Sequence, residues 1–445
     1  MKFCSTKYFK ENRESAEAPR AEVSYMDAIL RCLPSDGGLY VPSNVPDLRQ
    51  FFLHMDEKTS YPELVAALAP VLLDSFLNPL SASRVAESAF DYEPELIPLD
   101  ENTSVLTLYN GPTGVFKDFG VAFLAAVLEE LQKENGQIMV VSAVRWLSGA
   151  SIARTFRNRK GLTAVLLYPS GPIVGIDPST YAPNGGNIIP IQIRGNFSEC
   201  QRLVTELIND RPFAGRYNVT SADTINPGRL LPQAFYYLYA FIKAKKMLTG
   251  ELVFSVPSGN FGNFISGLYA WKFGMPVNGF IAAMNANDAF GSFIRGGEFI
   301  PRPHVSTCSP ALDVSQPTNY ERLSSFYVEA PAVMKNMVYP SCINDDATMT
   351  AMRYAWKNHN LLLDPHSAVA FAAAKNFQQN AVDDCGHTVV LATGHPAGES
   401  NIVKQATGQI IRLPDKLRDL NKQADPIALI DPQLDALENA IASLF

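Results

Sequence analysis

The sequence predicts an α/β fold with two mostly parallel sheets, preceded by a largely helical N-terminal region. Apolar segments of strand length recur along the chain, and most are apolar at every position rather than at alternate ones. Helical patterns separate most of them, and turns rich in glycine or polar residues follow several of them. Continuous apolar strands that alternate with helices are typical of parallel sheets buried on both faces.

Length and composition limit the class of protein. A chain of 445 residues is too long for one small core and indicates about two or three packed units. Its 47% hydrophobic and 18% charged residues are ordinary for a soluble globular protein. A net charge of −7 without a Lys- or Arg-rich run argues against nucleic acid as the main partner.

The N-terminus and the cysteines indicate the compartment. The first twenty residues contain no apolar core of a secretory signal. No stretch of about 18 apolar residues that could cross a membrane occurs in the sequence. The cysteines are scattered without a C-x-x-C pair, which favours free thiols in a reducing compartment. We therefore expect a cytoplasmic protein that does not bind membranes.

Residues 1–95 are expected to form an N-terminal, mostly helical domain. Within residues 23–48, a short amphipathic helix precedes a Pro-Ser-Asp-Gly-Gly turn and a short strand. Further helices fit residues 61–73 and 81–90.

From Val105 onward, strand and helix patterns alternate. The amphipathic pattern of residues 119–135 predicts a long helix that ends at Gly136, and further helices are expected from Ser148 and over 196–208. The expected strands are residues 137–143, 163–168, 187–193, 251–257, 278–284 and 388–393. Ligands of parallel sheets gather at the carboxyl ends of strands, so the turns that follow these strands are candidate sites.

The first candidate site is Lys117, at the start of the long helix in the segment GPTGVFKDFG. Phe116 and Phe119 flank it, so an apolar pocket and the positive end of the helix dipole would both favour the neutral amine. A neutral lysine amine can attack a carbonyl group or act as a general base. An exposed lysine paired with Asp118 or a nearby glutamate is the alternative that the local sequence leaves open.

Two glycine-containing turns follow later strands. After the strand at 251–257, the turn SGNFGN leads into a helix, where free amide groups can hold a phosphate. The turn lacks the Walker and dinucleotide-binding patterns, so a plain tight turn is the alternative. After the strand at 388–393, a second glycine turn follows Thr393, whose hydroxyl could meet a ring nitrogen.

Other chemistries find little support in the sequence. The six histidines show no metal-ligand spacing, and no G-x-S-x-G elbow predicts a hydrolase. His366 in the turn Asp-Pro-His is either catalytic or, as is commoner, a core histidine whose hydrogen bonds are satisfied. The aromatic residues of 234–244 are typical of a helix packed on two faces rather than of a base-stacking platform.

Taken together, these segments resemble the threonine synthase family of fold-type II, pyridoxal-phosphate-dependent enzymes. DGGLYVPSNVP resembles the N-terminal signature of that family, GPTGVFKDFG its lysine motif and VPSGNFGN its cofactor-phosphate loop. IAAMNANDAF, ALDVSQPTNYER, LDPHSAV and TGHPA follow in family order. The resemblance covers nearly the whole chain and implies two parallel-sheet α/β domains plus the helical N-terminal domain. Residues 96–445 would form the catalytic region, with a small subdomain at roughly 118–225 carrying the substrate loop and a large subdomain from the remainder.

The resemblance implies a role for each matching residue. Lys117 would bind pyridoxal phosphate covalently and later move protons at the α and β carbons of the substrate. Thr393 would contact the pyridine nitrogen as an uncharged partner. The other implied cofactor residues are Phe116 and the phosphate loop Gly259, Asn260, Phe261, Gly262 and Asn263. The segment SADTINPGRL resembles the substrate-phosphate pocket of the family, with Ser221, Asn226 and Arg229 matching.

The implied reaction is that of the family, in which O-phosphohomoserine loses its γ-phosphate and gains water at the β carbon. The implied partner is therefore a small, phosphorylated amino acid, and we expect the protein to bind neither nucleic acid nor a membrane. The chain is expected to be a monomer or a homodimer.

Three positions or segments depart from the family pattern. Asp223 stands where the family usually has asparagine, and a carboxylate beside a phosphate is unfavourable. Gly398 stands where the family commonly has lysine. Val144, Arg145, Trp146, Leu147, Ser148 and Gly149 stand where the family has T-S-G-D-T-G, the loop around the α-carboxylate of the substrate. Only Ser148 and Gly149 keep the character of the family loop.

Three interpretations of this loop remain open. In the first, Arg145 binds a carboxylate in a diverged paralogue that catalyses β- or γ-replacement or elimination on a different amino acid. In the second, the protein is a threonine synthase with an unusual loop. In the third, the bulky residues pack inward and leave a cofactor-binding but non-catalytic interaction protein. The intact Lys117, phosphate loop and Arg229 argue against the third.

Overall fold

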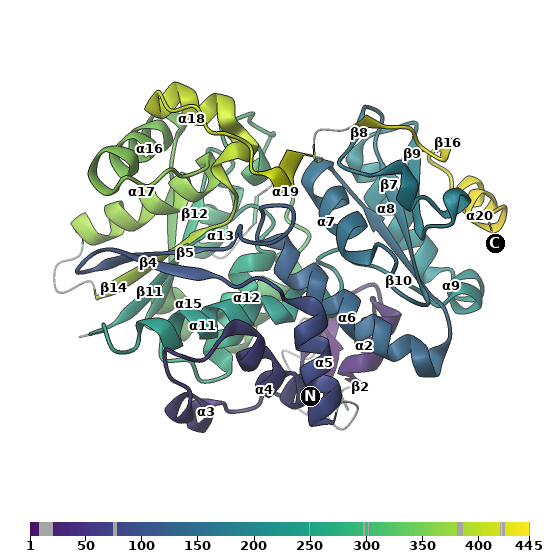
Figure 1. Cartoon of the computed structure of the whole chain (residues 1–445). Coiled ribbons are helices and arrows are strands. Elements are labelled where there is room, and N and C mark those ends of the chain that lie inside the picture. Colours follow the sequence, from purple (N-terminus) through teal and green to yellow (C-terminus); the bar gives the residue numbers. More distant parts are fainter. Residues whose placement is uncertain are drawn as a thin grey trace.

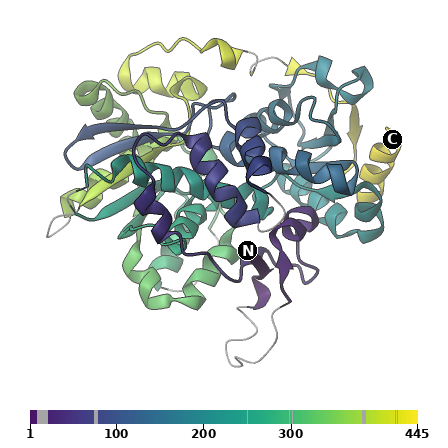
Figure 2. The same ribbon diagram turned by 60° about the horizontal axis from the view of Figure 1, so that its bottom comes forward.

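The computed structural model describes residues 1–8, 21–73, 78–248, 250–296, 299–300, 302–380, 386–418, 420 and 423–444. Two separate sheets, each covered by helices, form the two halves of the molecule, and a smaller N-terminal unit lies against them (Figure 1 and Figure 2). The predicted α/β fold with two mostly parallel sheets is confirmed.

The N-terminal unit combines helices with a small antiparallel sheet of order β2-β1-β3. Its described elements are β1 (Lys2–Ser5), β2 (Val23–Ser24), α2 (Tyr25–Arg31), β3 (Tyr40–Pro42), α3 (Arg49–His54), α4 (Tyr61–Leu73) and α5 (Pro79–Ala89). Helix α2 begins at Tyr25 because the hydroxyl of Ser24 accepts a hydrogen bond from the amide of Asp27. The helices expected over 61–73 and 81–90 are present.

The large sheet has the order β13-β12-β11-β14-β5-β4 and is parallel except for its edge pair β4 and β5. Its strands are β4 (Glu95–Asp100), β5 (Thr103–Thr107), β11 (Leu252–Pro257), β12 (Gly279–Met284), β13 (Val338–Cys342) and β14 (His387–Ala392). Phe254 of β11 joins the core beside α11 (Ala234–Ala244) and α12 (Gly262–Lys272), whereas Val253 joins the core beside α16 (Asp345–His359) and α17 (Pro365–Asn380). Burial on both faces explains why these strands are apolar at every position.

The small sheet has the order β10-β6-β7-β9-β16 and is entirely parallel. Its strands are β6 (Ile138–Ala143), β7 (Leu162–Tyr168), β9 (Ile188–Ile193), β10 (Val219–Thr220) and β16 (Ala428–Ile430). Helices α6 (Lys117–Asn135) and α7 (Trp146–Phe156) pack on one face, and α8 (Phe197–Asn209) and α20 (Leu434–Ala442) on the other. Strand β16 extends this sheet beyond the segment at roughly 118–225 that the family resemblance implied.

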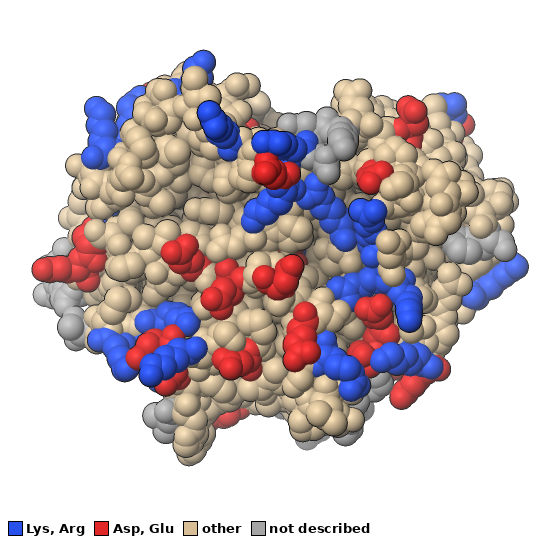
Figure 3. All heavy atoms as spheres, in the orientation of Figure 1, with Lys and Arg blue, Asp and Glu red and all other residues tan. Residues whose placement is uncertain are grey.

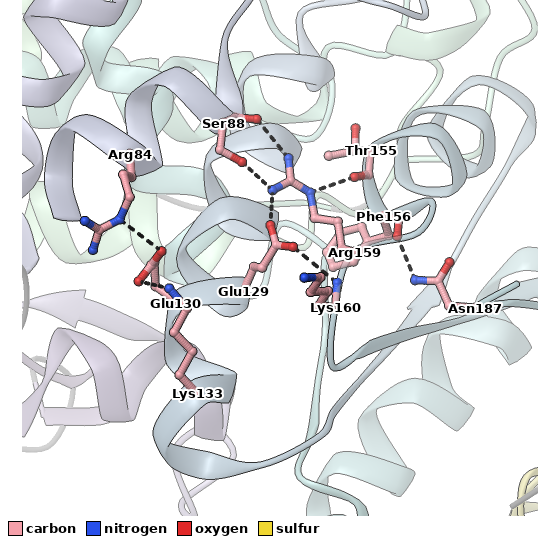
Figure 4. Close-up of polar contacts among 10 residues, drawn as sticks. All are labelled: Arg84, Ser88, Glu129, Glu130, Lys133, Thr155, Phe156, Arg159, Lys160 and Asn187. Atoms are coloured by element: carbon pink, nitrogen blue, oxygen red, sulfur yellow. Dashed lines mark hydrogen bonds and ion pairs between the residues drawn. The ribbon is translucent and has the colours of Figure 1, made fainter. Parts of the chain in front are cut away.

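Several sets of contacts join the units, including the following two. Figure 4 shows that the Arg159 guanidinium, just after α7, donates to Ser88 of α5 and, over 2.8 Å, to Glu129 of α6. On another side, Leu417 of α19 (Asp415–Arg418) and Leu420 pack on Ala150 of α7. Strand β15 (Gln423–Ala424) then pairs with β8 (Ile173–Val174). The further described α-helices are α9 (Arg211–Tyr217), α10 (Pro227–Leu230), α13 (Ala289–Gly296), α14 (Tyr320–Glu329), α15 (Pro331–Met337) and α18 (Ser400–Thr407).

The surface carries charges of both signs. On the face drawn in Figure 3, basic side chains gather along the upper part of the junction between the halves, and acidic and basic side chains mix along the lower part. Among the residues that the structure describes, no helix is both long and apolar enough to cross a membrane. Among the described residues, Cys4, Cys32, Cys200, Cys308 and Cys342 form no disulfide bond, and Cys385 lies outside the described residues.

Candidate active site

Lys117 is the first residue of α6, as the sequence predicts, and the turn before it is held by the end of β14. The amide of Phe116 donates to the carbonyl of Thr393 over 2.9 Å, and the amide of His395 donates to the carbonyl of Gly114 over 2.8 Å. These bonds place the lysine motif beside the glycine turn after β14, although the two lie far apart in the sequence. Lys117 and Thr393 are therefore neighbours, as the family resemblance implies.

The surroundings of Lys117 favour its neutral form. The pKa of the Lys117 amine is lowered to about 8. Burial is the largest cause, the positive charges of Arg229 and Arg145 act in the same direction, and the negative charge of Asp118 opposes them. Asp118 itself is buried and accepts hydrogen bonds from the amide and hydroxyl of Thr113 and from the hydroxyl of Ser151. The structure thus supports the buried, partly neutral lysine rather than an exposed lysine paired with Asp118.

The turn of residues 258–263 links β11 to α12. Phe261 adopts the left-handed conformation, with φ of 59°, which turns the chain sharply into the helix. A Cβ atom on Gly259 would lie 2.9 Å from the Cα of Leu312, so only glycine fits this position without a shift. The buried Nδ2 of Asn263 has no hydrogen-bond partner among the described residues, whereas its Oδ1 accepts from the hydroxyls of Tyr236 and Tyr237. An unsatisfied donor beside the start of a helix fits the binding of a phosphate.

Asn260 anchors this turn to neighbouring segments. Its Nδ2 donates to the hydroxyl of Thr224 over 3.2 Å, and its Oδ1 accepts from the amide of Thr318 over 2.6 Å and from the Thr318 hydroxyl. The side chain of Asn260 is therefore committed to holding the turn. Its backbone remains available for a ligand.

The segment of residues 221–229 packs directly on the lysine helix. A Cβ atom on Gly120 of α6 would lie 2.3 Å from the carbonyl oxygen of Arg229. Arg229 is 4% exposed, its Nη1 donates to the carbonyl of Ala222, and its Nε has no partner among the described residues. The segment thereby places a buried cation with a spare donor close to Lys117.

The side chains of Ser221 and Asn226 form hydrogen bonds that stabilise the turn of this segment. The Nδ2 of Asn226 donates to the carbonyls of Ile29 and Ser221 and to the hydroxyl of Thr220, and its Oδ1 accepts from the amide of Gly228. The hydroxyl of Ser221 accepts from the amide of Asp223 over 3.0 Å. Both side chains are fully buried and shape the turn that carries Arg229.

Asp223 joins the same segment to the end of β6. Its Oδ2 accepts a hydrogen bond from the amide of Ala143 over 3.0 Å. Burial raises the pKa of the Asp223 carboxyl to about 6, although the charge of Arg229 and the bonds from Ala143 and Ser221 act in the opposite direction. A partly buried carboxyl group therefore lies next to the loop of residues 144–149 and close enough to Arg229 for their charges to interact.

The loop after β6 places its unusual side chains in different surroundings. Val144 is fully buried in the core, and Leu147 packs against the cluster of Ala150, Leu417 and Leu420. Arg145 is exposed, and its guanidinium stacks on the ring of Phe197 at 4.2 Å from the ring centre. The side chain of Trp146 lies outside the described part of the structure.

Ser148 and Gly149, the family-like residues of this loop, are tightly placed. The hydroxyl of Ser148 donates to the carbonyl of Arg145 and accepts from its amide, at 2.8 and 3.0 Å. A Cβ atom on Gly149 would lie 2.1 Å from the hydroxyl of Tyr168, which is buried and has no partner among the described residues. The Ser148 hydroxyl thus caps α7, and Gly149 admits a tyrosine that local sequence patterns did not single out.

His366 fits the commoner of its two readings. Its Nδ1 bonds the carboxylate of Asp364 over 2.5 Å, and its Nε2 accepts from the amide of Ala311 over 3.0 Å. Asp364 also accepts from the amide of Ser367, and the hydroxyl of Ser367 accepts from the amide of Thr393. These residues therefore support the turn that carries Thr393. In the sequence, the match of LDPHSAV to the family motif was the signal that pointed to them as a group.

The comparisons with known proteins agree with this geometry. Residues 106–394 match the family described as pyridoxal-phosphate dependent enzyme, residues 9–84 the threonine synthase N terminus and residues 367–441 the threonine synthase C-terminal region. The threonine synthase of Serratia marcescens is 32% identical over 400 residues, which cover 89% of this chain and 91% of that protein. The threonine synthase of Escherichia coli K12 is 31% identical with the same coverage.

Solved structures show the same likeness. The crystal structure of threonine synthase from Escherichia coli superposes with a TM-score of 0.84 at 28% identity, covering 100% of both chains. A threonine synthase from Brucella melitensis, solved with pyridoxal phosphate bound, gives a TM-score of 0.83 at 27% identity, covering 100% of this chain and 99% of that one. Both similarities extend over the two halves and the N-terminal unit.

Proposed function

Because the chain belongs to the threonine synthase family of pyridoxal-phosphate-dependent enzymes, we propose that it converts O-phosphohomoserine and water into threonine and inorganic phosphate. The observation that carries this proposal is the position of residues 221–229, which bring Arg229 close to Lys117 and whose Thr224 contacts the 259–263 turn. A reactive amine and two places for phosphate are what a phosphorylated substrate and a phosphorylated cofactor require.

The described residues fit pyridoxal phosphate. Lys117 would hold it covalently, the loop Gly259, Asn260, Phe261, Gly262 and Asn263 would bind its phosphate, Thr393 would meet its ring nitrogen, and Phe116 would lie beside it. The spare Nδ2 of Asn263 and the close approach at Gly259 support the phosphate assignment. When bound, the cofactor supplies an electron sink for negative charge that develops on carbons next to the substrate's amino group.

The proton transfers fall to Lys117. An amine whose pKa is about 8 is partly neutral near neutral pH, so it can take a proton from a substrate carbon and return it elsewhere. Its position at the first turn of α6, which Asp118 ties to α7 through Ser151, keeps the amine in place during both transfers. The positive charge of Arg229 nearby opposes reprotonation of the free amine.

Arg229 is the proposed partner of the substrate phosphate. It is a buried cation with an unsatisfied Nε, and a guanidinium can bind a phosphate through parallel hydrogen bonds. Ser221 and Asn226 would act beside it chiefly by shaping the turn, because their polar atoms bond within the protein.

Arg145 is the proposed partner of the substrate α-carboxylate, together with Ser148 and Gly149 at the start of α7. Stacking on Phe197 engages the face of the guanidinium and leaves its N–H edge in the plane, where a carboxylate can bind. The amide groups of the first turn of α7 can add further donors. One charged residue would then replace several neutral donors of the family loop.

Two observations favour a second candidate function, which is replacement or elimination on a different amino acid. The Asp223 carboxyl lies in the segment that carries Arg229, and Arg145 adds a charge in the neighbouring loop after β6. A carboxylate near the phosphate pocket weakens the attraction for a second phosphate.

The test is a turnover assay of the purified protein loaded with pyridoxal phosphate. Equal amounts of phosphate and threonine should appear from O-phosphohomoserine. A protein that binds the cofactor yet releases no phosphate would contradict the proposal, and amino acids that change the cofactor spectrum would then identify the second candidate. A spectrum that no amino acid changes would identify a non-catalytic interaction protein.

We also place the enzyme in the cytoplasm, acting on a small molecule as a monomer or homodimer. The free thiols of the described cysteines are of the kind that persists in a reducing compartment. Sedimentation of the purified protein measures the oligomeric state.

A further inference from the structure

We propose that Arg322 is a positioning residue that fixes the cofactor-phosphate turn and the substrate-phosphate segment relative to each other. The inference rests on the proposed function, because it concerns the two phosphate sites assigned above. Nothing in the local sequence around Arg322 predicts this role. It follows from contacts that join four distant parts of the chain.

Arg322 is a fully buried cation whose hydrogen bonds go to neutral acceptors. It lies in α14 and is 0% exposed. Its Nε donates to the carbonyl of Tyr40 over 3.0 Å, and its Nη1 donates to the carbonyl of Thr224 over 2.6 Å and to the Oδ1 of Asn319 over 2.8 Å. Its Nη2 donates to the carbonyl of Ile225. A buried guanidinium is tolerated only when its donors are satisfied, so these acceptors are held firmly in place.

Thr224 links Arg322 to the cofactor-phosphate turn through hydrogen bonds. While its carbonyl is held by Arg322, its hydroxyl accepts from the Nδ2 of Asn260 over 3.2 Å and from the Nδ2 of Asn319 over 3.1 Å. A Cβ atom on Gly262 would lie 3.4 Å from the Cγ2 of Thr224, so the side chain of Thr224 packs close to the backbone of Gly262. A shift of Thr224 would therefore move the turn that is proposed to bind the phosphate.

The same contacts close into a ring. Asn260 accepts a hydrogen bond from the amide of Thr318, and Thr318 and Asn319 directly precede α14, which carries Arg322. Each member of the ring is thus bonded on two sides. Such a closed arrangement resists displacement more than a single bond does, because no member can move without breaking two contacts.

Ile225 links Arg322 to the segment of residues 221–229, which is proposed to bind the substrate phosphate. Its carbonyl is held by Arg322, and it is followed immediately by Asn226, whose amide group fixes the turn that leads to Arg229. The contact with Tyr40 adds strand β3 of the N-terminal unit to the same support. One guanidinium therefore sets both phosphate sites at once and connects them to the N-terminal unit.

The test compares Arg322→Met with Arg159→Met. Arg159 is also a bridging arginine, bonded to Ser88, Glu129 and Thr155, but it lies in the network of Figure 4, away from the phosphate sites. The dissociation constant of pyridoxal phosphate is measured by fluorescence titration of the protein stripped of cofactor, with inorganic phosphate as a competitor. Arg322→Met should weaken the binding of both by about tenfold or more, since bonds to a charged group are lost. Arg159→Met should lower the melting temperature but leave both constants within about twofold of the wild type.

Two milder variants guard against misfolding. Arg322→Lys keeps the charge but cannot reach all four acceptors, and should bind the cofactor with an affinity between those of the wild type and Arg322→Met. Thr224→Val keeps the held carbonyl and removes the hydroxyl links to Asn260 and Asn319, and should weaken cofactor binding several-fold. If Arg322→Lys and Thr224→Val both bind pyridoxal phosphate as the wild type does, the proposal is wrong.

The two proposals can fail separately. Cofactor and phosphate affinities require no turnover, so they test Arg322 even if the amino-acid substrate proves to be a different one. Where O-phosphohomoserine is a substrate, Arg322→Met should also raise its KM more than it lowers kcat, because positioning of a phosphate is lost rather than the proton-transfer group. A wild-type protein that binds no pyridoxal phosphate would contradict the proposed function itself.

Discussion

The two walls of the candidate active site use their side chains differently. On the large-sheet wall, Asn260 and Asn263 direct side-chain atoms to Thr224, Tyr236 and other neighbours, and a phosphate would be met mainly by backbone and by one spare amide. On the small-sheet wall, two charged side chains lie just after or against the end of β6, with Arg145 exposed and stacked on Phe197 and Asp223 bonded to the amide of Ala143. A backbone site suits one unchanging group, the cofactor phosphate, whereas charged side chains determine which substrate enters.

Replacing Lys117 should produce the largest effect on either wall. Lys117→Ala removes both the attachment point of the cofactor and the proposed proton carrier, so turnover should fall by about a thousandfold or more. Borohydride reduction followed by peptide mapping should find pyridoxyl-lysine at residue 117 in the wild type. The control is Lys133→Ala, an exposed lysine of the same helix that pairs with Glu130. Modification of another lysine in its place would contradict the assignment.

Replacing Arg229 should separate the two phosphates. Arg229→Met should raise the dissociation constant of O-phosphohomoserine by about ten- to a hundredfold, because a buried charged hydrogen bond is lost. The affinity for pyridoxal phosphate should change far less. Homoserine, which lacks the phosphate, provides the control, and its binding should be nearly unaffected. An equal loss for homoserine would mean that Arg229 supports the fold of the segment rather than binding phosphate.

Replacing Arg145 tests whether the small-sheet wall recognises the carboxylate. Arg145→Ala should weaken amino-acid binding about tenfold, measured by the change in cofactor absorbance, and leave cofactor binding nearly unchanged. Phe197→Leu retains the charge but removes the stacking ring, so it should cause a smaller loss. Equal losses for cofactor and amino acid would show that Arg145 is structural.

The sequence predicted the large-sheet wall of the candidate active site better than the small-sheet wall. The strands, Lys117 at a helix start and the turn of residues 258–263 follow from local patterns, because glycines and continuous apolar segments constrain the nearby backbone. The contact of Arg145 with Phe197 and the three backbone acceptors of Arg322 join residues far apart in sequence, so no local pattern contains them. Strands β10, β13 and β16 were not predicted either, because each is short or contains proline and polar residues and so carries too little periodicity to indicate a strand.

Asp223→Asn should give a smaller effect, which depends on pH. The folded protein holds the pKa of Asp223 near 6, whereas an unfolded aspartate titrates near about 4, so the native state binds more protons between these values. Stability contributed by this group is therefore present below pH 4 and is lost as the pH rises through 6, by about 3 kcal/mol. Asparagine can still accept from the amide of Ala143 and cannot ionise.

The variant should therefore be more stable than the wild type at pH 8 by about 3 kcal/mol and nearly equal to it at pH 4, as measured by urea unfolding at the two values. A stability difference that is the same at both pH values would show that Asp223 does not titrate in this range. The same substitution restores the residue of the family pattern and removes a negative charge near Arg229. If the small-sheet wall selects the substrate, the Asp223→Asn variant should also bind O-phosphohomoserine several-fold more tightly than the wild type at pH 8. Its binding of homoserine should be unchanged.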